Sequence, residues 1–322
     1  MVAGLIRRLR NTLAQIFFLI AALRRWGDTV LEAGHWTTRD WSGDEFTYAF
    51  GSGRVRYVSH GSGPALVLLH GMACCWQWWL ECIPTLAQQH RVIAVDLPGF
   101  GDSDPLPAGA SIADQADAVA ALLGSLDLAE VALVGHSMGG LVATSISQRY
   151  PGLVRRLILV DAGGVPMSER RLAAVLKVLR VAHRTFTRSS VLRLLATSRR
   201  ARSVMLRGAM ADPGTMSDAL AAVVIPKLNA PGFLGAIEAS ARAVRASRPE
   251  SIGTPTSLIW GERDVFAPVS TAHDMLSRLP DGSLTVLAGV GHSPMVEAPA
   301  DFCEVLLREA SLAIRNASRS TT

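Results

Sequence analysis

The hydrophobic pattern changes at about residue 46, where short apolar runs begin to alternate with longer helical stretches. Two β-rich segments, 46–50 and 54–59, flank a Gly-Ser-Gly turn and predict a pair of strands. Six nearly continuous apolar runs follow at 65–69, 92–95, 131–134, 157–160, 256–260 and 284–287. Runs of this kind are typical of strands buried on both faces of a parallel sheet. The pattern therefore predicts an α/β protein with a mostly parallel sheet and helices on both faces.

The strand pattern stops between residues 164 and 250. This stretch is helical in composition, with one apolar stripe at Leu172, Val175, Leu176 and Leu179. A helical insertion between two strands of one sheet explains this most simply. We interpret residues 164–250 as a helical lid, inserted into a core that comprises residues 43–163 and 251–322.

The segment before the sheet, residues 1–42, contains an amphipathic helix predicted over 5–25. Its apolar stretch between Arg10 and Arg24 is 13 residues long, whereas a membrane-spanning helix needs about 20. Arg24 and Arg25 stand where a signal peptide would have its cleavage site. The tryptophans 26, 36 and 41 then follow, a residue type that favours membrane interfaces. We favour an interfacial anchor; packing on the protein itself or on a partner, a signal and a span stay open.

Composition and charge narrow the class of protein. Apolar residues make up 49% and charged residues 18% of the chain, which excludes a disordered or collagen-like protein. The four cysteines form no disulfide framework and no zinc-type spacing, so we expect a reducing compartment and a cytoplasmic protein without a metal.

The positive charge is concentrated in two regions. The net charge is +5 overall, but +4 in residues 1–28 and +10 in residues 165–250. This distribution indicates an anionic membrane surface as a partner, at the inner face of the membrane. A solvated helical face is the alternative. Nucleic acid is not expected, because no nucleic-acid-binding motif accompanies the arginines.

The clearest chemical motif is Gly135-His136-Ser137-Met138-Gly139, which follows the apolar run 131–134 and precedes a helical segment. A Gly-x-Ser-x-Gly sequence between a strand and a helix places the serine on a tight, strained turn. The flanking positions must be glycine because a Cβ there would collide with the neighbouring strand or helix. Ser137 is therefore the predicted nucleophile.

A serine hydroxyl needs a base, and the base needs an acid that orients it. Asp264 follows the run 256–260, and His292 follows the run 284–287. Both lie where strands end, and they come in the order Ser, acid, His that is typical of a strand–turn–helix nucleophile. Asp161, after the run 157–160, is the alternative acid.

The negative charge that develops on the substrate oxygen requires backbone N–H donors. Met138, the residue after the nucleophile, supplies one, and Met72 in the His70-Gly71-Met72 loop is our choice for the other. We interpret His70 as a residue that organises this loop through hydrogen bonds. Asp96 and Asp102 are interpreted as structural.

With these motifs the chain resembles the α/β-hydrolase superfamily over residues 46–163 and 251–315. The matching segments are 70–71, 96–103, 135–140, 260–264 and 291–292. The resemblance implies a mostly parallel sheet with a lid inserted after the sixth strand. It also implies an enzyme that works without a cofactor.

The type of nucleophile narrows the expected reaction. Relatives that open epoxides or remove halides use aspartate at this position, so Ser137 favours acyl transfer and a carboxylic ester as substrate. A lid rich in Leu, Val, Ala and Met would line an apolar acyl site, which favours a lipophilic ester such as a monoacylglycerol. Trp76 is a candidate wall of the acyl pocket. The alternative reaction is hydrolysis of a carbon–carbon bond in a diketo acid. In that reaction the arginines 180, 184 and 188 would bind the substrate carboxylate. A perhydrolase or lyase, and a non-hydrolytic accessory protein, stay open as well.

Overall fold

A computed structural model describes residues 36–163, 168–207 and 209–317, and within helix α5 and after residue 311 some side chains are left out of the description. Its centre is an eight-stranded sheet in the order β1-β2-β4-β3-β5-β6-β7-β8. The strands are β1 (Glu45–Phe50), β2 (Gly53–His60), β3 (Ala65–Leu69), β4 (Arg91–Val95), β5 (Val131–His136), β6 (Val154–Val160), β7 (Thr256–Gly261) and β8 (Gly282–Leu287). Strands β3 to β8 pair in parallel, and β1 and β2 pair antiparallel at one edge. All eight predicted strands are confirmed.

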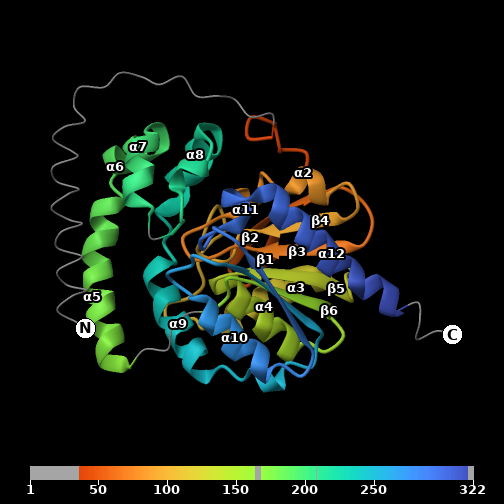
Figure 1. Ribbon diagram of the computed structural model, residues 1–322. Coiled ribbons are helices and arrows are strands. Elements are labelled where there is room, and N and C mark those ends of the chain that lie inside the picture. The colour runs from red at the N-terminus through yellow and green to blue at the C-terminus, as the bar shows by residue number, and fades with distance from the viewer. Residues whose placement is uncertain (1–35, 164–167, 208, 318–322) are drawn as a thin grey trace.

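Helices cover both faces of this sheet (Figure 1). They are η2 (Trp76–Trp79), α2 (Ile83–Leu86), α3 (Ile112–Ser125), α4 (Met138–Arg149), α5 (Glu169–Phe186), α6 (Ser189–Thr197), α7 (Arg199–Met205), η3 (Pro213–Thr215), α8 (Asp218–Val224), η4 (Ile225–Leu228), α9 (Phe233–Ala246), η5 (Pro249–Ser251), α10 (Val269–Arg278), α11 (Pro294–Glu297) and α12 (Pro299–Ala317). Alternate residues of each strand point to opposite faces. Leu66 and Leu68 therefore pack on the face with α12, and Val67 and Leu69 pack on the face with α3 and α4.

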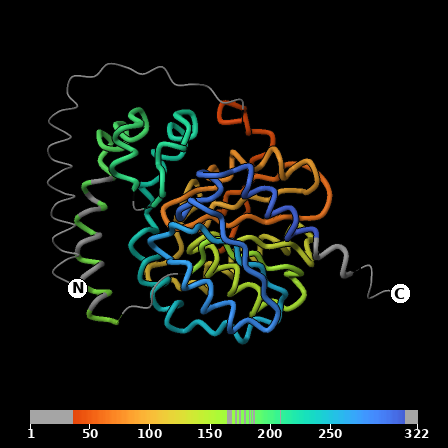
Figure 2. The backbone as a smooth tube through the Cα atoms, in the orientation of Figure 1, coloured from red at the N-terminus to blue at the C-terminus, as the bar shows by residue number. Residues whose placement is uncertain are grey.

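The insertion between β6 and β7 runs from α5 to η5 and lies beside the sheet (Figure 2). Helices α6, α7 and α8 share a hydrophobic cluster with η2 and α12, whereas α9 packs with α3 and α4. The insertion thus contributes to the cores on both faces of the sheet.

Within the insertion, a buried arginine connects three helices. The side chain of Arg202 is fully buried, pairs with Asp218 at the start of α8, and donates to the carbonyl oxygens of Leu195 and Ala196 in α6. Removing its charge partner would leave a buried cation, which is strongly destabilising. The arrangement of α6, α7 and α8 therefore depends on this pair.

The end of the predicted arm belongs to the body of the protein, which corrects the interpretation of two tryptophans as interfacial. Trp41 is buried, and its ring meets that of Trp76 edge-on at a centroid distance of 5.3 Å. Trp36 packs against the same cluster. The helix predicted over 5–25 and Trp26 lie outside the described residues.

No single helix among the described residues has the length and apolarity needed to cross a bilayer. The segments Asp218–Leu228 and Phe233–Ala246 reach the required length and apolarity only when taken together, and they are bent by 87° relative to each other.

Candidate active site

Ser137 occupies the sharp turn between β5 and α4. Its backbone has φ 52° and ψ −117°, a strained conformation for a residue with a side chain. A Cβ on Gly135 would lie 2.4 Å from the Gly139 carbonyl oxygen, and one on Gly139 would lie 2.5 Å from the Leu69 carbonyl oxygen. The two glycines are thus required by close backbone contacts, for the reason that the motif predicts.

The structure brings Ser137, His292 and Asp264 together in one hydrogen-bonded chain. His292 Nε2 lies 2.9 Å from Ser137 Oγ, and His292 Nδ1 lies 2.6 Å from Asp264 Oδ2. The other oxygen of Asp264 accepts the N–H groups of Phe266 and Ala267, which holds the buried carboxylate in place. This is the geometry of a nucleophile, a general base and an orienting acid.

Asp161, the alternative acid, lies beside this chain of residues. Its oxygen, an oxygen of Asp264 and a nitrogen of His292 all lie within 4.8 Å of one another. Asp161 Oδ1 accepts the Gly261 N–H at 2.8 Å, and the side chain is fully buried. Burial, reinforced by the nearby charge of Asp264, raises the pKa of Asp161 well above its usual value. This shift favours the protonated form of Asp161, whereas Asp264 is the carboxyl that bonds to His292.

Asp161, Asp264 and His292 bring possible metal-binding atoms close together, but those of His292 are engaged in hydrogen bonds. The two ring nitrogens of His292 already face Asp264 and Ser137. A metal would have to displace one of these hydrogen bonds, so the residues fit proton transfer better than metal binding.

Two further histidines are buried near the nucleophile and are neutral. His70 donates from Nδ1 to the Gly71 carbonyl oxygen at 2.7 Å and accepts the Leu97 N–H at Nε2, which is the organising role predicted for it. His136 donates from Nε2 to the carbonyl oxygen of His292 at 2.7 Å. Burial lowers the pKa of His70 to about 4 and that of His136 to about 3. The contact from His136 to the backbone of the catalytic histidine was missed in the sequence, although His136 adjoins Ser137.

The loop that carries Met72 lies against the nucleophile. A Cβ on Gly71 would lie 3.1 Å from the Cβ of Ser137. Met138 is the first residue of α4, where backbone N–H groups lack partners within the helix. Both N–H groups chosen as oxyanion donors therefore belong to segments that adjoin Ser137. Their role stays a prediction.

Asp96 has the structural role expected of it. Its carboxylate accepts the backbone N–H groups of Trp76 and Asp102. Burial raises the pKa of Asp96 to about 7. Asp102 forms an ion pair with Lys227 of the insertion, at 2.6 Å.

Of the predicted substrate contacts, Trp76 is corrected by the structure, whereas those of the arginines stay predictions. Trp76 is 1% exposed and packs in the core, so it leaves no surface for an acyl chain. Arg180 is exposed and lies 3.8 Å from Glu238 on α9, so an ion partner already faces its charge. The side chain of Arg184 lies outside the described residues, and Arg188 is exposed at the start of α6. Aromatic and basic residue types alone did not indicate which side chains face the site.

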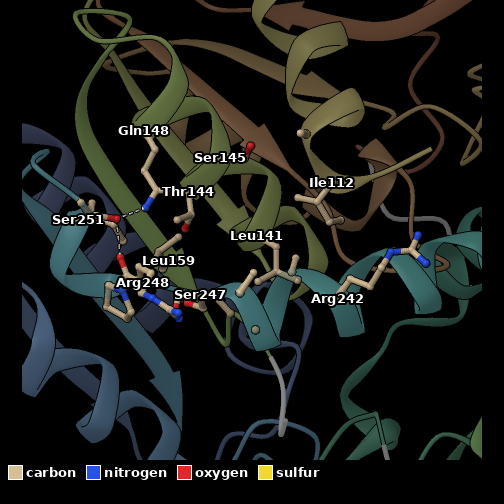
Figure 3. A pocket seen from close by; sticks show the side chains of 18 of the residues that line it. Ile112, Leu141, Thr144, Ser145, Gln148, Leu159, Arg242, Ser247, Arg248 and Ser251 are labelled. Atoms are coloured by element: carbon tan, nitrogen blue, oxygen red, sulfur yellow. Dashed lines mark hydrogen bonds between the residues drawn. The ribbon is translucent and has the colours of Figure 1, made fainter. Parts of the chain in front are cut away.

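A cavity of about 500 Å³ lies beside the nucleophile helix, between α4 and α9 (Figure 3). Its lining includes Leu141 and Thr144 of α4, Leu159 of β6 and Arg242 of α9. Ser137, Asp264 and His292 are not among the lining residues, so this cavity is separate from the triad.

Comparison with known proteins agrees with this architecture. Residues 64–299 match the model of the alpha/beta hydrolase fold family. The chain is 33% identical over 264 residues to an uncharacterized protein of Mycobacterium tuberculosis, a match that covers 77% of this chain and 75% of that protein. Other similar proteins bear the names of an esterase, an epoxide hydrolase and a 2-hydroxy-6-oxononadienedioate hydrolase.

Two solved structures share the fold over most of the chain. A putative lipase from Acinetobacter baumannii has a TM-score of 0.68 and 22% identity, covering 90% of this chain and all of that one. A membrane phospholipase A has a TM-score of 0.64 and 25% identity, covering 97% and 98%. The family match, the sheet order and the nucleophile turn agree, and the chain belongs to the alpha/beta hydrolase fold family.

Proposed function

We propose that the protein is a serine hydrolase that cleaves a lipophilic carboxylic ester through an acyl-enzyme on Ser137. The observation that carries this proposal is the hydrogen-bonded chain from Ser137 Oγ through His292 to Asp264. A module that only binds a ligand has no need for these three groups in this order. A serine nucleophile also distinguishes the site from sites that use aspartate to open epoxides.

The proposed mechanism follows from these contacts. His292 Nε2 takes the proton of Ser137 as its oxygen attacks the carbonyl carbon, and then gives that proton to the departing alcohol. Asp264 accepts the Nδ1–H of His292, which keeps Nε2 free to act as the base. The N–H groups of Met72 and Met138 would stabilise the negative oxygen of the intermediate. Water then attacks the acyl-enzyme by the same steps.

Apolar side chains beside the triad support a lipophilic substrate. Val265 and Phe266, directly after Asp264, are 66% and 53% exposed, and the Phe266 ring meets that of His292 edge-on at 5.3 Å. On the insertion, Leu172, Leu176 and Ile237 form a cluster against which Met72 packs. Exposed apolar groups at a site favour an apolar ligand.

Ester hydrolysis can be tested with p-nitrophenyl esters of two to sixteen carbons, run beside a vinylogous diketo acid. We expect hydrolysis of the esters and a higher kcat/KM for longer chains, since each buried methylene contributes about 0.8 kcal/mol of transfer free energy. Phe266→Ser, which removes the ring beside His292, should reduce the preference for long chains. Cleavage of the diketo acid without ester hydrolysis would instead establish that the protein is a carbon–carbon bond hydrolase.

We further propose that the enzyme attaches peripherally to the anionic inner face of a membrane, through residues 1–28 and the basic insertion. There is no acidic residue between Glu169 and Asp212. In α6, α7 and the segments that flank them, the side chains of Arg188, Arg193, Arg199 and Arg207 are exposed. A basic side chain near an anionic leaflet contributes roughly 1 kcal/mol of binding free energy. The similarity to a membrane phospholipase A also supports this proposal.

Vesicle co-sedimentation of the full chain tests the attachment. Binding should require phosphatidylglycerol in addition to phosphatidylcholine, weaken with added salt, and decrease sharply without residues 1–28. The double variant Arg193→Glu/Arg199→Glu should weaken it, whereas Arg242→Glu/Arg248→Glu, at the cavity beside α4, is the matched control. Equal binding to neutral vesicles would contradict the attachment. Equal effects of the two variants, which both lie in the insertion, would contradict a specific role for α6 and α7.

A further inference from the structure

The segment that carries His292 lies between a strand and a helix, so its backbone N–H groups have few acceptors in regular secondary structure. Residues 288–293, here called the histidine loop, connect β8 to α11. A buried backbone N–H in such a loop requires an acceptor from elsewhere. Glu297, the last residue of α11, supplies two of these acceptors: its Oε2 accepts the Gly291 N–H and its Oε1 accepts the Ser293 N–H, both at 3.1 Å.

The same carboxylate also binds the insertion. Glu297 Oε2 accepts the N–H of Ala211 at 2.8 Å and that of Asp212 at 3.3 Å. These two residues lie between α7 and η3, in a segment of the insertion that we call the contact segment (residues 209–212). One side chain therefore joins the backbone on both sides of His292 to a part of the chain more than eighty residues away.

The two backbone segments touch directly at Gly291. A Cβ on this glycine would lie 2.3 Å from the Ala211 nitrogen and 2.9 Å from Glu297 Oε1. Ser293 Oγ also reaches the carbonyl oxygen of Ala209, at 3.4 Å. The contact segment therefore packs on the histidine loop without an intervening side chain at residue 291.

From these contacts we propose that Glu297 is a positioning residue for His292 that couples the catalytic histidine to the insertion. The backbone of His292 is held on one side by Glu297, through the N–H groups of its two neighbours, and on the other by His136, through its carbonyl oxygen. The ring is then directed to Asp264 and Ser137. Four backbone N–H groups donate to Glu297, and displacement of the contact segment removes two of them. The loop that carries His292 then becomes less firmly held.

The competing explanation is a local one. Ser293 precedes α11, and a carboxylate that accepts its N–H serves as an ordinary helix cap. A cap explains the bond to Ser293 but gives no reason for the bonds to Ala211 and Asp212. The two explanations differ in whether changing Glu297 disturbs the contact segment and the catalytic step.

The test compares Glu297→Ala and Glu297→Gln with Glu304→Gln, an exposed glutamate on α12 that undergoes the same change in charge. Because the positioning role rests on the proposed function, steady-state kinetics on a short p-nitrophenyl ester is one readout. A misplaced base can cost about 100-fold in rate. Glu297→Ala should therefore lower kcat by about that factor with little change in KM, and it should slow labelling by a fluorophosphonate equally. Glu297→Gln keeps one acceptor oxygen, so its kcat and its labelling rate should lie between those of Glu297→Ala and the wild type.

Hydrogen exchange is the second readout, and it does not depend on activity. In Glu297→Ala, peptides that contain 209–212 and 290–293 should both exchange faster, while peptides from β5 and α4 should not. If Glu297→Ala does not fold, Glu297→Gln carries both measurements. Unchanged kcat, or faster exchange confined to 290–293, would overturn the proposal. A wild-type protein that neither hydrolyses esters nor reacts with the fluorophosphonate would instead refute the proposed function, and exchange would still report the coupling.

Discussion

Replacing Ser137 with alanine should abolish ester hydrolysis and leave the fold intact. In a serine–histidine–aspartate site, loss of the nucleophile lowers kcat by about six orders of magnitude. Stability should change little, because serine and alanine both carry a Cβ, and the strain at φ 52° is the same for each. Turnover of a p-nitrophenyl ester and thermal unfolding of the same preparation measure the two effects.

Covalent labelling provides the control for this prediction. A fluorophosphonate should add one adduct to the wild-type protein, at Ser137, and none to Ser137→Ala. Ser145→Ala, a change of the same size on α4, should keep both labelling and turnover. Intact-mass spectra without an adduct on the wild-type protein would contradict the serine-hydrolase assignment.

Replacing Asp264 with asparagine should lower turnover by about four orders of magnitude, because the amide favours the wrong tautomer of the histidine. Asp161→Asn should change turnover by less than about tenfold, which corresponds to roughly 1.4 kcal/mol. The reason is that burial raises the pKa of Asp161 and so favours its neutral form, and asparagine is a neutral group of the same shape. The amide oxygen can still accept the Gly261 N–H.

The pair of variants also tests which carboxyl is the acid. Both residues are buried beside His292, so a similar loss of activity from either change would mean that they act as one coupled unit. Loss from Asp161→Asn alone would reverse the assignment. Circular dichroism of each variant should show that the buried substitutions preserve the fold.

The sequence alone was sufficient to predict the sheet and the triad of Ser137, Asp264 and His292. Six of the strands occur where continuous apolar runs were identified, and β1 and β2 occur at the two β-rich segments that flank the Gly-Ser-Gly turn. The turn at Ser137 was predictable as well, because close backbone contacts allow only glycine at residues 135 and 139. Local patterns report these features because a buried strand and a tight turn each require particular residue types at positions close together in the chain.

Only the tertiary structure decided which distant side chains meet. It decided between Asp264 and Asp161 as the partner of His292, and it packed Trp76 in the core although its residue type also fits a pocket wall. It also joined Glu297 to the contact segment of the insertion. These contacts depend on the path of the whole chain, and a glutamate or tryptophan has the same local pattern whether it faces solvent, core or site. For that physical reason the triad residues were predictable, whereas the contacts that support them were not.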